Sequence, residues 1–552
     1  MGALTLKSFP FELRGWEIEK FESIDPTDGF GANTRVYISK NQVIQIEPEY
    51  DVNSFNTWLT DRGRQFFDGI FGNQLSYKKQ KSNSLEKNSW LTIIKTIIQT
   101  LYIFDHCNNQ TSKKHVFTIV FENLSLETLS LLLVISQNYS FINLKRIENV
   151  NVNNDLETNF QLNLASNKIK LSSSTLCLLL STNPRYEGYY LNLNLRQRFF
   201  KGNFKCLTIG SFIDLTFPIS FLGSNLKVLK TIVEGNNLAC QDIKFSKNPI
   251  LIYNTELLKR NDGQNSIEML KILKHANIFT NSWNGSNMLA PSLNEVGIQS
   301  IAKFQPINSQ DLTNFSSLYF LNAGINNISN FKQIIEAKLL NCSPNSNKEF
   351  DMSKLAYTNK LILNQNSNPN NDSIFFNELK KFISINKDSS YKYYYLPNSM
   401  FYENSETFIN TEGLIKRTTK LISRKKTKNN WQILRKFFKQ FKTELTFLNN
   451  KDNHIIFFNS KKLTNFKNFI NFQYFATQSL TNLNFYLNIK TKPFVLNEKT
   501  NQFKLKTTKI KNTKLKYWLD DFFIGSKDEY SQNSLILANC SRILRSESTN
   551  FF

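Results

Sequence analysis

Metal-binding residues are scarce in this sequence and follow no ligand pattern. Among 552 residues there are six cysteines and four histidines. The cysteines occur singly, without a CxxC pair, at Cys107, Cys177, Cys206, Cys240, Cys342 and Cys540. This spacing supports neither a zinc site nor a cysteine-ligated cluster. We interpret the cysteines as small apolar side chains in a reducing compartment.

Membrane-spanning and targeting segments are also missing. No apolar run approaches the roughly 18 residues that a transmembrane helix needs. The first residues contain neither a basic segment followed by an apolar one nor an Arg/Ser-rich amphipathic stretch. We therefore expect no secretory signal, no transit peptide and no transmembrane segment.

Catalytic motifs are lacking too. There is no Walker, GxSxG or HExxH motif, and Gly29-Phe30-Gly31 is a lone GxG in a hairpin context. The carboxylate pairs Asp25/Asp28 and Asp520/Asp521 are interpreted as turn or surface residues. No set of residues predicts a reaction.

Positive charge is in excess. Lys and Arg outnumber Asp and Glu by 68 to 44, and the formal net charge is +24. Such a balance suggests nucleic acid, an acidic protein partner or an anionic membrane surface. The chain is also rich in Phe, Lys, Asn and Ile, whose codons are AT-rich, as organellar genes often are. A biased gene is therefore a competing cause of the charge.

The length predicts two to four domains, and the first of them begins with strands. Alternation through Phe9, Phe11, Leu13, Trp16 and Ile18 predicts strands with one buried face. A turn cluster follows at 25–31. A second alternation, from Val36 to Ile46 around Lys40-Asn41-Gln42, predicts a hairpin with a polar tip.

Strands and helices then alternate. Expected strands are 116–121, 141–144, 176–180, 205–209, 250–253, 318–321, 361–363 and 393–396. Expected helices are 84–101, 126–135, 191–200, 226–233, 266–273, 331–340, 375–383 and a segment from Asn430 to Phe441. The pattern implies a parallel sheet with helices on both faces. The segments 149–159 and 450–517 are expected to be loops or irregular β structure.

Two segments are candidates for ligand binding. The strand–turn–helix at Asn183 to Gly188 lies where a nucleotide-binding fold has its phosphate loop, but it lacks the glycines. Lys416 to Lys442 interleaves basic residues with Trp431, Phe437 and Phe438, as single-strand nucleic-acid binders do. Helical spacing favours a buried aromatic stripe with a solvated basic face instead.

Short motifs along the whole chain resemble one family. They are GALT at 2–5, FELR at 11–14, ESIDPTDGFGAN at 22–33, WLTDR at 58–62, LLSTNPRYE at 179–187, GSFIDLTF at 210–217, RNDG at 260–263, LP at 396–397, ENS at 403–405, NTEG at 410–413, DFF at 521–523 and LANC at 537–540. In this order they resemble the G-type, largest cluster-carrying subunit of respiratory complex I, NADH:ubiquinone oxidoreductase. The chain is identified as similar to its C-terminal half.

The resemblance marks a set of signature residues with an expected structural role. They are Glu22, Ser23, Asp25, Gly31, Asn33, Trp58, Asp61, Asn183, Pro184, Arg185, Glu187, Arg260, Asp262, Gly263, Asn410, Glu412 and Gly413. Two departures weaken any retained ligand site. Leu414 follows Gly413 where the family has Arg, and Asn398 stands after Pro397 where Gly is usual.

The resemblance implies an α/β, molybdopterin oxidoreductase-like fold. A small N-terminal antiparallel β region (1–75) would be followed by interleaved doubly wound α/β domains (76–415) and a basic C-terminal region with a docking tail (416–552). The implied function is a non-catalytic structural subunit of complex I, with no catalytic, cofactor-binding or metal-binding residue in this chain. Alternatives are an active molybdopterin oxidoreductase and a basic nucleic-acid-binding protein.

The resemblance also implies partners and a location. The family's clusters precede its GALT segment, whereas Met1 precedes Gly2 here. We therefore expect a split subunit whose iron–sulfur N-terminal half is a separate polypeptide, with other peripheral-arm subunits as further partners and no nucleic acid. The expected location is the matrix side of the mitochondrial inner membrane, peripherally bound.

Overall fold

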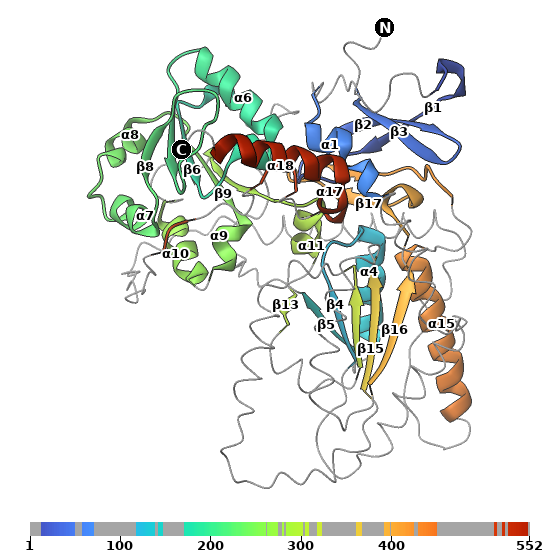
Figure 1. Ribbon diagram of the computed structural model, residues 1–552. Helices are drawn as coiled ribbons and strands as arrows, with labels where there is room; N and C mark the ends of the chain where they lie inside the picture. The colour runs from blue at the N-terminus through green and yellow to red at the C-terminus, as the bar shows by residue number, and fades with distance from the viewer. Residues whose placement is uncertain are drawn as a thin grey trace.

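The computed structural model describes most of the α/β framework of the chain (Figure 1). The described residues are 13–49, 58–70, 117–138, 142–146, 171–260, 262–273, 279–280, 283–301, 304–307, 317–322, 360–366, 391–397, 399–423, 429–449, 513–515, 521–524 and 528–549. Among them, no helix is both long and apolar enough to cross a membrane.

A three-stranded antiparallel sheet opens the described chain. Its strands are β1 (Glu19–Ile24), β2 (Asn33–Ser39) and β3 (Gln42–Pro48), in that order. The predicted hairpin between β2 and β3 is confirmed, and its tip places Lys40 and Asn41 at positive φ. Such a tip matches the twist of a two-residue hairpin turn.

The prediction of a strand through Trp16 is wrong. Gly15–Glu17 forms the 3₁₀ turn η1, and the Trp16 side chain is 81% exposed. The expected buried face does not exist at this point because η1 lies outside the sheet. Phe9 and Phe11 lie outside the described residues.

A five-stranded parallel sheet forms the second unit (Figure 1, left). Its strands, in spatial order, are β12 (Ser286–Leu289), β9 (Ile250–Asn254), β6 (Leu176–Leu180), β7 (Lys205–Ile209) and β8 (Ser220–Gly223). The helices of this unit are α5 (Pro184–Glu187), α6 (Tyr189–Phe200), α7 (Leu226–Val233), α8 (Ala239–Phe245), α9 (Thr255–Lys259) and α10 (Gly263–Leu273).

Both faces of this sheet are buried. Leu176, Leu178 and Leu180 pack in one core with α7 and α10, whereas Cys177 and Leu179 pack in another with α6. Alternate residues of a strand point to opposite faces, so a continuous apolar run is what a doubly covered central strand requires.

A six-stranded parallel sheet forms the third unit. Its spatial order is β13 (Gln305–Pro306), β5 (Ile142–Arg146), β4 (Phe117–Phe121), β14 (Ser317–Leu321), β15 (Lys360–Asn366) and β16 (Tyr391–Pro397). Helices α4 (Leu126–Asn138) and α15 (Asn430–Asn449) lie beside it (Figure 1). The sequence pattern predicts one parallel sheet, whereas the structure has two.

The remaining elements connect these units. They are α1 (Asp61–Gln65), η3 (Leu171–Ser173), β10 (Phe279–Thr280), β11 (Trp283–Asn284), α11 (Glu295–Ile301), η7 (Phe401–Glu403), β17 (Thr407–Ile409), β18 (Ile415–Arg417), α17 (Glu529–Asn533) and α18 (Leu535–Thr549). The C-terminal helices return to the start of the chain: the Ile536 amide donates to Asp68 Oδ2 at 3.0 Å. Helix α18 is the red helix near α1 in Figure 1.

The mixed α/β class with a small N-terminal antiparallel region is as expected from the sequence. Every expected strand from Val116 onward has a counterpart, as do the helices at 126–135, 191–200, 226–233, 266–273 and 430–441. Helices expected at 84–101, 331–340 and 375–383, the loop at 149–159 and most of 450–517 lie outside the described residues. The domain boundaries stay a prediction.

Candidate functional site

The carboxyl edge of the five-stranded sheet contains its topological switch point. Strands β6 and β9 are neighbours, yet α6 after β6 packs in one core and α9 and α10 after β9 pack in the other. In open parallel sheets, ligands bind in the crevice where successive connections diverge in this way. This edge is therefore the first place to test for a ligand.

A buried carboxylate bridges the two strands at that crevice. Glu187 at the end of α5 is 1% exposed, and its Oε2 accepts a hydrogen bond from Asn254 Nδ2, at the end of β9, at 2.9 Å. Asn183 caps α5 by accepting from the Arg185 amide, and Pro184 occupies the first helical position. The TNPR turn is thus a helix start.

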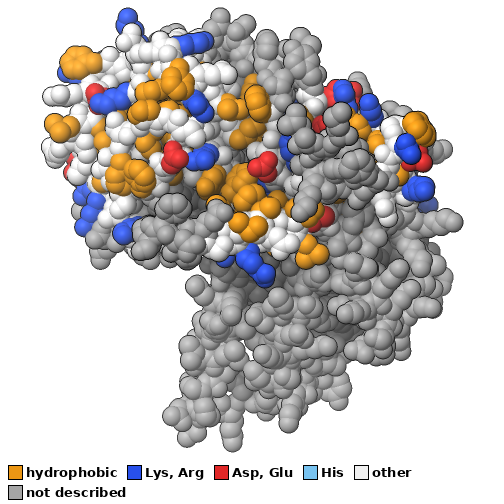
Figure 2. Space-filling model, turned by 45° about the horizontal axis from the view of Figure 1, so that its top comes forward, with side chains coloured by type: hydrophobic (Ala, Val, Ile, Leu, Met, Phe, Trp, Pro, Cys, Tyr) orange, Lys and Arg blue, Asp and Glu red, His pale blue; other side chains and the backbone are white. Residues whose placement is uncertain are grey.

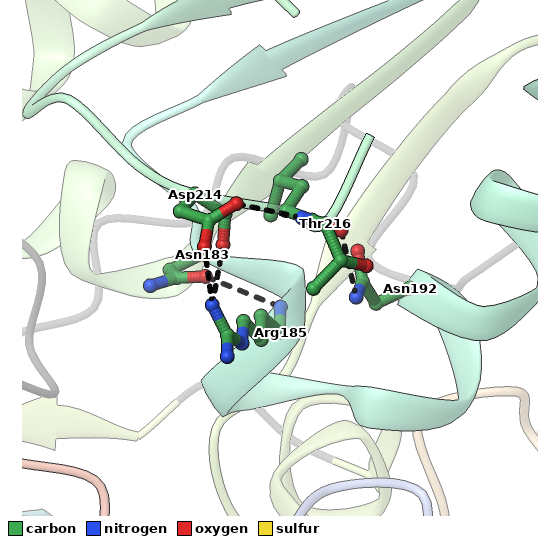
Figure 3. Close-up of polar contacts among 6 residues, drawn as sticks. Asn183, Arg185, Asn192, Asp214 and Thr216 are labelled. Atoms are coloured by element: carbon green, nitrogen blue, oxygen red, sulfur yellow. Dashed lines mark hydrogen bonds and ion pairs between the residues drawn. The ribbon is translucent and has the colours of Figure 1, made fainter. Parts of the chain in front are cut away.

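Arg185 points outward to the connection between β7 and β8 (Figure 3). Its Nη1 lies 2.8 Å from Asp214 Oδ2, and Asp214 Oδ1 accepts from the Thr216 amide at 2.9 Å. Asn192 of α6 donates to the Leu215 carbonyl at 3.4 Å. These contacts hold the 210–217 segment against the helices that follow β6.

Phe30 from the N-terminal loop fills the space beside the switch point. It is 3% exposed and packs with Leu289, at the end of β12, and Tyr190. A Cβ on Gly188 would come within 2.7 Å of the Phe30 ring. The glycine therefore permits this close approach of the ring to the turn after β6.

The β17–β18 turn encloses the same loop from another side. The Thr411 amide donates to the Gly29 carbonyl at 2.7 Å, and Asn410 Nδ2 donates to the Phe30 carbonyl at 3.1 Å. A Cβ on Gly29 would overlap the Ala290 carbonyl oxygen and Thr411. We call these contacts, between 29–31, Gly188, Ala290 and 410–413, the loop junction.

The structure brings part of the signature set together at this junction. Asp25 and Gly31 lie in the N-terminal loop, and Gly31 has φ +57. Asn33 begins β2 and accepts from Lys416 Nζ at 2.8 Å. In the facing turn, Gly413 has φ +80 and Glu412 accepts from Asn410 Nδ2 at 3.4 Å.

Other signature residues lie elsewhere. Arg260 Nε donates to Asp262 Oδ1 at 2.9 Å, just before α10, and Arg260 Nη2 donates to Thr513 Oγ1 at 2.7 Å. A Cβ on Gly263 would overlap the Leu258 carbonyl oxygen. This group is a helix start separate from the loop junction.

The remaining signature residues lie in the three-stranded unit. Trp58 is 65% exposed, with its carbonyl oxygen accepting from Tyr189 OH at 2.6 Å, and Asp61 is an exposed first residue of α1. Ser23 is 5% exposed and Glu22 is exposed, with its carbonyl oxygen accepting from Thr419. None of these four positions reaches the loop junction through a described hydrogen bond.

Asp25 and Asp28 are turn residues, as interpreted, because their carboxylates accept from the Thr27 and Phe30 amides, but they are not surface residues. Their side chains are 0% and 2% exposed because α1 and the C-terminal segment cover the turn. Arg62, 1% exposed, donates to the Thr27 carbonyl at 3.0 Å and to the Phe522 carbonyl at 3.3 Å. Asp521 is 7% exposed and binds Arg545, whereas Asp520 lies outside the described residues.

Burial changes the acidity of this cluster. Loss of solvation raises the pKa of Asp28 to about 7; the nearby Asp25 adds to this and Arg62 opposes it. Loss of solvation likewise raises the pKa of Asp25, and that of Asp528 to about 6, against the field of Arg62. One buried guanidinium thus faces three aspartates, and burial raises the pKa of each above its usual value although Arg62 opposes the shift.

A second buried pair joins the six-stranded unit to the β17–β18 ribbon. Glu127 of α4 accepts from Thr407 Oγ1 at 2.6 Å and from the Thr407 amide at 3.1 Å. Burial, followed by the field of Glu127, raises the pKa of Glu406 to about 8. The Glu127 carboxylate therefore links α4 to β17, because it binds both the hydroxyl and the amide of Thr407.

A metal site is not found in the described part of the chain. There, no group of three or more His, Cys, Asp or Glu side chains is placed to hold an ion. The fold implies a pterin cofactor, whose phosphates favour glycine-rich backbone cradles. At the switch point Glu187 presents a buried carboxylate and Phe30 an apolar ring, so this donor set does not fit an anionic pterin.

Sequence reasoning missed several residues that build this region. Arg62 and Gly188 stand within the 58–62 and 183–188 segments, but the sequence predicts no role for either, and it places Phe30 only within a GxG motif. Asn294 was also missed: its Oδ1 accepts from the Ile409 amide at 2.9 Å while its side chain donates to the Leu124 carbonyl. Apart from Thr27, which lies 35 positions before Arg62, the partners described above are more than 100 positions away, so no local pattern points to them.

The class of protein follows from the sheets, the junction and the matched family. Residues 77–440 match the molybdopterin oxidoreductase family, and the chain belongs to it. Among curated proteins, it is 31% identical over 311 residues to the NADH-ubiquinone oxidoreductase 75 kDa subunit of Reclinomonas americana, covering 54% of this chain and 44% of that protein.

Two further relatives have matching names. The G-type subunit of the NADH-quinone oxidoreductase of Rickettsia bellii is 28% identical, over 54% of this chain and 43% of its own length. The mitochondrial NADH-ubiquinone oxidoreductase 78 kDa subunit of Neurospora crassa is 28% identical, over 54% of this chain and 40% of its own. The chain spans less than half the length of these relatives.

Proposed function

We propose that this chain is a non-catalytic structural module in the peripheral, matrix-side arm of mitochondrial respiratory complex I. It supports iron–sulfur clusters carried by a separate polypeptide, the other half of the same subunit, during electron transfer from NADH to ubiquinone. The chain itself carries no cofactor in this proposal. Its other partners are neighbouring peripheral-arm subunits.

The observation that carries the proposal is the composition of the loop junction. Segments that resemble the complex I subunit, at 25–33, 183–188 and 410–413, meet in buried contacts with one another. The switch point, where the fold would bind a ligand, is packed by Phe30 and bridged by Glu187. The residues are therefore arranged for rigid mutual support, and the names of the relatives point to the same complex.

The nucleic-acid alternative loses its main support. Trp431, Phe437 and Phe438 are 6%, 6% and 5% exposed, and Phe437 stacks on Phe117 with ring centroids 6.0 Å apart. Buried rings cannot stack on bases, so the predicted apolar stripe of α15 is confirmed. The helix begins at Asn430 itself, one residue earlier than the predicted cap implies.

Isolation of the tagged chain from native membranes tests the proposal. We expect it to co-purify with NADH:ubiquinone oxidoreductase activity and with a second polypeptide that carries the iron, measured by mass spectrometry and elemental analysis. Stoichiometric molybdenum and pterin in the chain would overturn the non-catalytic role. A single longer polypeptide containing both halves would overturn the split, and absence of the activity would overturn membership of the complex.

A further inference from the structure

Two exposed aromatic side chains meet at one edge of the five-stranded sheet. Phe221 lies in β8 and Phe212 in the connection after β7, and they are 44% and 75% exposed. Their ring centroids are 6.1 Å apart in an edge-to-face arrangement. Contiguous exposed apolar patches often mark interaction sites in soluble proteins. Figure 2 shows hydrophobic and basic side chains interleaved over this unit, at upper left.

Strand β8 is the last strand of its sheet. Its inner side pairs with β7, with Thr208 opposite Phe221, and no strand in the described ranges pairs with the outer side of Ser220–Gly223. An open edge offers a row of backbone donors and acceptors, and proteins commonly protect such an edge with charge, proline or a covering segment. Here the exposed side chain in the strand is a phenylalanine.

The outer side of this edge already accepts a strand just beyond β8. The Leu515 amide donates to the Ser224 carbonyl at 2.9 Å, and Asn225 forms an antiparallel bridge with Lys514. Ser211 Oγ donates to the Leu515 carbonyl at 2.9 Å and holds this short pairing in place. The backbone at the edge is thus oriented for antiparallel pairing.

The charges beside the edge are positive. Lys227, in the first turn of α7, and Lys514 are exposed, and neither forms an ion pair within the described part of the chain. The carboxylate in the neighbouring connection, Asp214, is neutralised by Arg185 at 2.8 Å. With a formal charge of +24 on the chain, an acidic partner is the complementary one.

We propose that the outer edge of β8 binds an extended acidic segment of a partner polypeptide as an added strand. Backbone hydrogen bonds to Ser220–Gly223 provide the affinity. Apolar side chains at alternate positions of the segment pack on Phe212 and Phe221, and carboxylates between them meet Lys227 and Lys514. This is strand addition, in which backbone pairing gives affinity and alternate side chains give specificity. It goes beyond the proposed function and does not depend on it.

Hydrogen exchange of the full-length chain tests the pairing. The probes are two synthetic peptides of about ten residues, one alternating Glu and Val and one alternating Lys and Val. We expect the Glu-Val peptide to slow exchange of the outward-facing β8 amides at least about tenfold, and the Lys-Val peptide to leave it unchanged. Amides already protected without peptide, or protected equally by both peptides, would overturn the proposal.

Substitutions test the side chains. Phe221→Asp and, independently, Phe212→Asp change exposed rings and should weaken Glu-Val binding at least about tenfold by fluorescence anisotropy, a difference of about 1.4 kcal/mol. The matched control is Phe245→Asp in α8, because this ring is 81% exposed and lies outside β8 and the 210–217 connection. The affinity of this variant for the Glu-Val peptide should equal that of the wild type. Wild-type affinity in both edge variants would overturn the proposal, whether or not the chain co-purifies with complex I.

Discussion

Asp28 and Phe30 lie two positions apart in one loop and are buried for different reasons. The Asp28 carboxylate accepts hydrogen bonds from the amides of Phe30 and Gly31, each at 3.0 Å, and so shapes the loop. The Phe30 ring then packs beside the ends of β6 and β12. A polar atom that organises backbone and a ring that excludes water together hold the loop junction.

Glycine at position 29 should be required for this junction. A Cβ at Gly29 would overlap backbone atoms of Ala290, which cannot move aside like a flexible side chain. We expect Gly29→Ala to lower the free energy of unfolding by about 2–3 kcal/mol, as overpacking does. Chemical denaturation measures it.

The matched control is Gly15→Ala, because nothing lies within 4 Å of a Cβ at Gly15. Its free energy of unfolding should stay within about 0.5 kcal/mol of wild type. Equal effects of the two substitutions would contradict the close packing at Gly29.

The raised pKa of Asp28, about 7, makes stability depend on pH. A carboxyl whose pKa is higher in the folded than in the unfolded protein stabilises the fold while it is protonated. That contribution is fully present below the unfolded pKa near 4 and is lost as pH rises to about 7.

We expect Asp28→Asn to remove this pH-dependent loss of stability. The side-chain oxygen of the introduced asparagine can still accept from the Phe30 and Gly31 amides. The variant should therefore gain stability relative to wild type as pH rises from 4.5 to 7.5, by up to about 1.4 kcal/mol per pH unit. Urea unfolding at both pH values measures the difference. A variant-to-wild-type difference that is the same at both pH values would show that Asp28 titrates normally.

Helix α15 shows that the spacing of apolar residues, and not charge, determines where a helix packs. Its Lys and Arg residues suggest a binding surface, but the 3.6-residue spacing of its aromatics predicts a helix with one buried face, and that prediction is confirmed. The helix packs in the core of the six-stranded unit, through Phe117 and Tyr319 among others. Charge describes the solvated face of this helix, whereas its position is set by the apolar face.

Phe437→Ala should therefore destabilise the six-stranded unit. The centroid of the Phe437 ring lies 6.0 Å from that of Phe117 and 4.9 Å from that of Phe438. Removal of the ring leaves a cavity and should lower the free energy of unfolding by about 3–5 kcal/mol. Lys439→Ala, at an exposed position of the same helix, should change stability by less than about 0.5 kcal/mol. Thermal unfolding followed by circular dichroism compares them, and equal melting temperatures would refute the buried stripe.

At the scale of the whole molecule, the two ends of the described chain close on each other. Arg62 joins Thr27 to Phe522, and its guanidinium carbon lies 5.4 Å from the centroid of the Phe522 ring. A Cβ on Gly69 would overlap the Tyr530 carbonyl oxygen, which shows how closely α17 approaches the segment after α1. The hydrophobic core beneath the N-terminal sheet therefore includes residues more than 450 positions later, such as Tyr530 and Leu537.

Arg62→Met should loosen this closure. The substitution keeps much of the volume but leaves buried carboxyls without their guanidinium, a loss of about 3–5 kcal/mol. Faster hydrogen exchange in 528–549 would report the release of the C-terminal helices. Arg64→Met, on the same helix but only half-buried, is the control and should exchange like wild type. Unchanged exchange in Arg62→Met would show that Arg62 does not hold the two ends together.

Local patterns predicted the α/β class, the hairpin, the order of strands and helices and the buried stripe of α15. Period-two and period-3.6 spacing act over a few residues, and an uninterrupted run such as Leu176–Leu180 already implies a strand covered on both faces. The motif resemblance pointed to the family for the same reason, because each motif is short and contiguous.

Only the tertiary structure decided that there are two parallel sheets, that Asp25 and Asp28 are buried, and that Phe30 fills the switch point. Each of these depends on contacts between segments far apart in sequence. The chain starts the six-stranded sheet with β4 and β5, completes the five-stranded sheet, and returns with β13. Burial of a residue depends on what packs over it, and here the covering segments, such as 410–413 and 521–524, come from the far end of the chain.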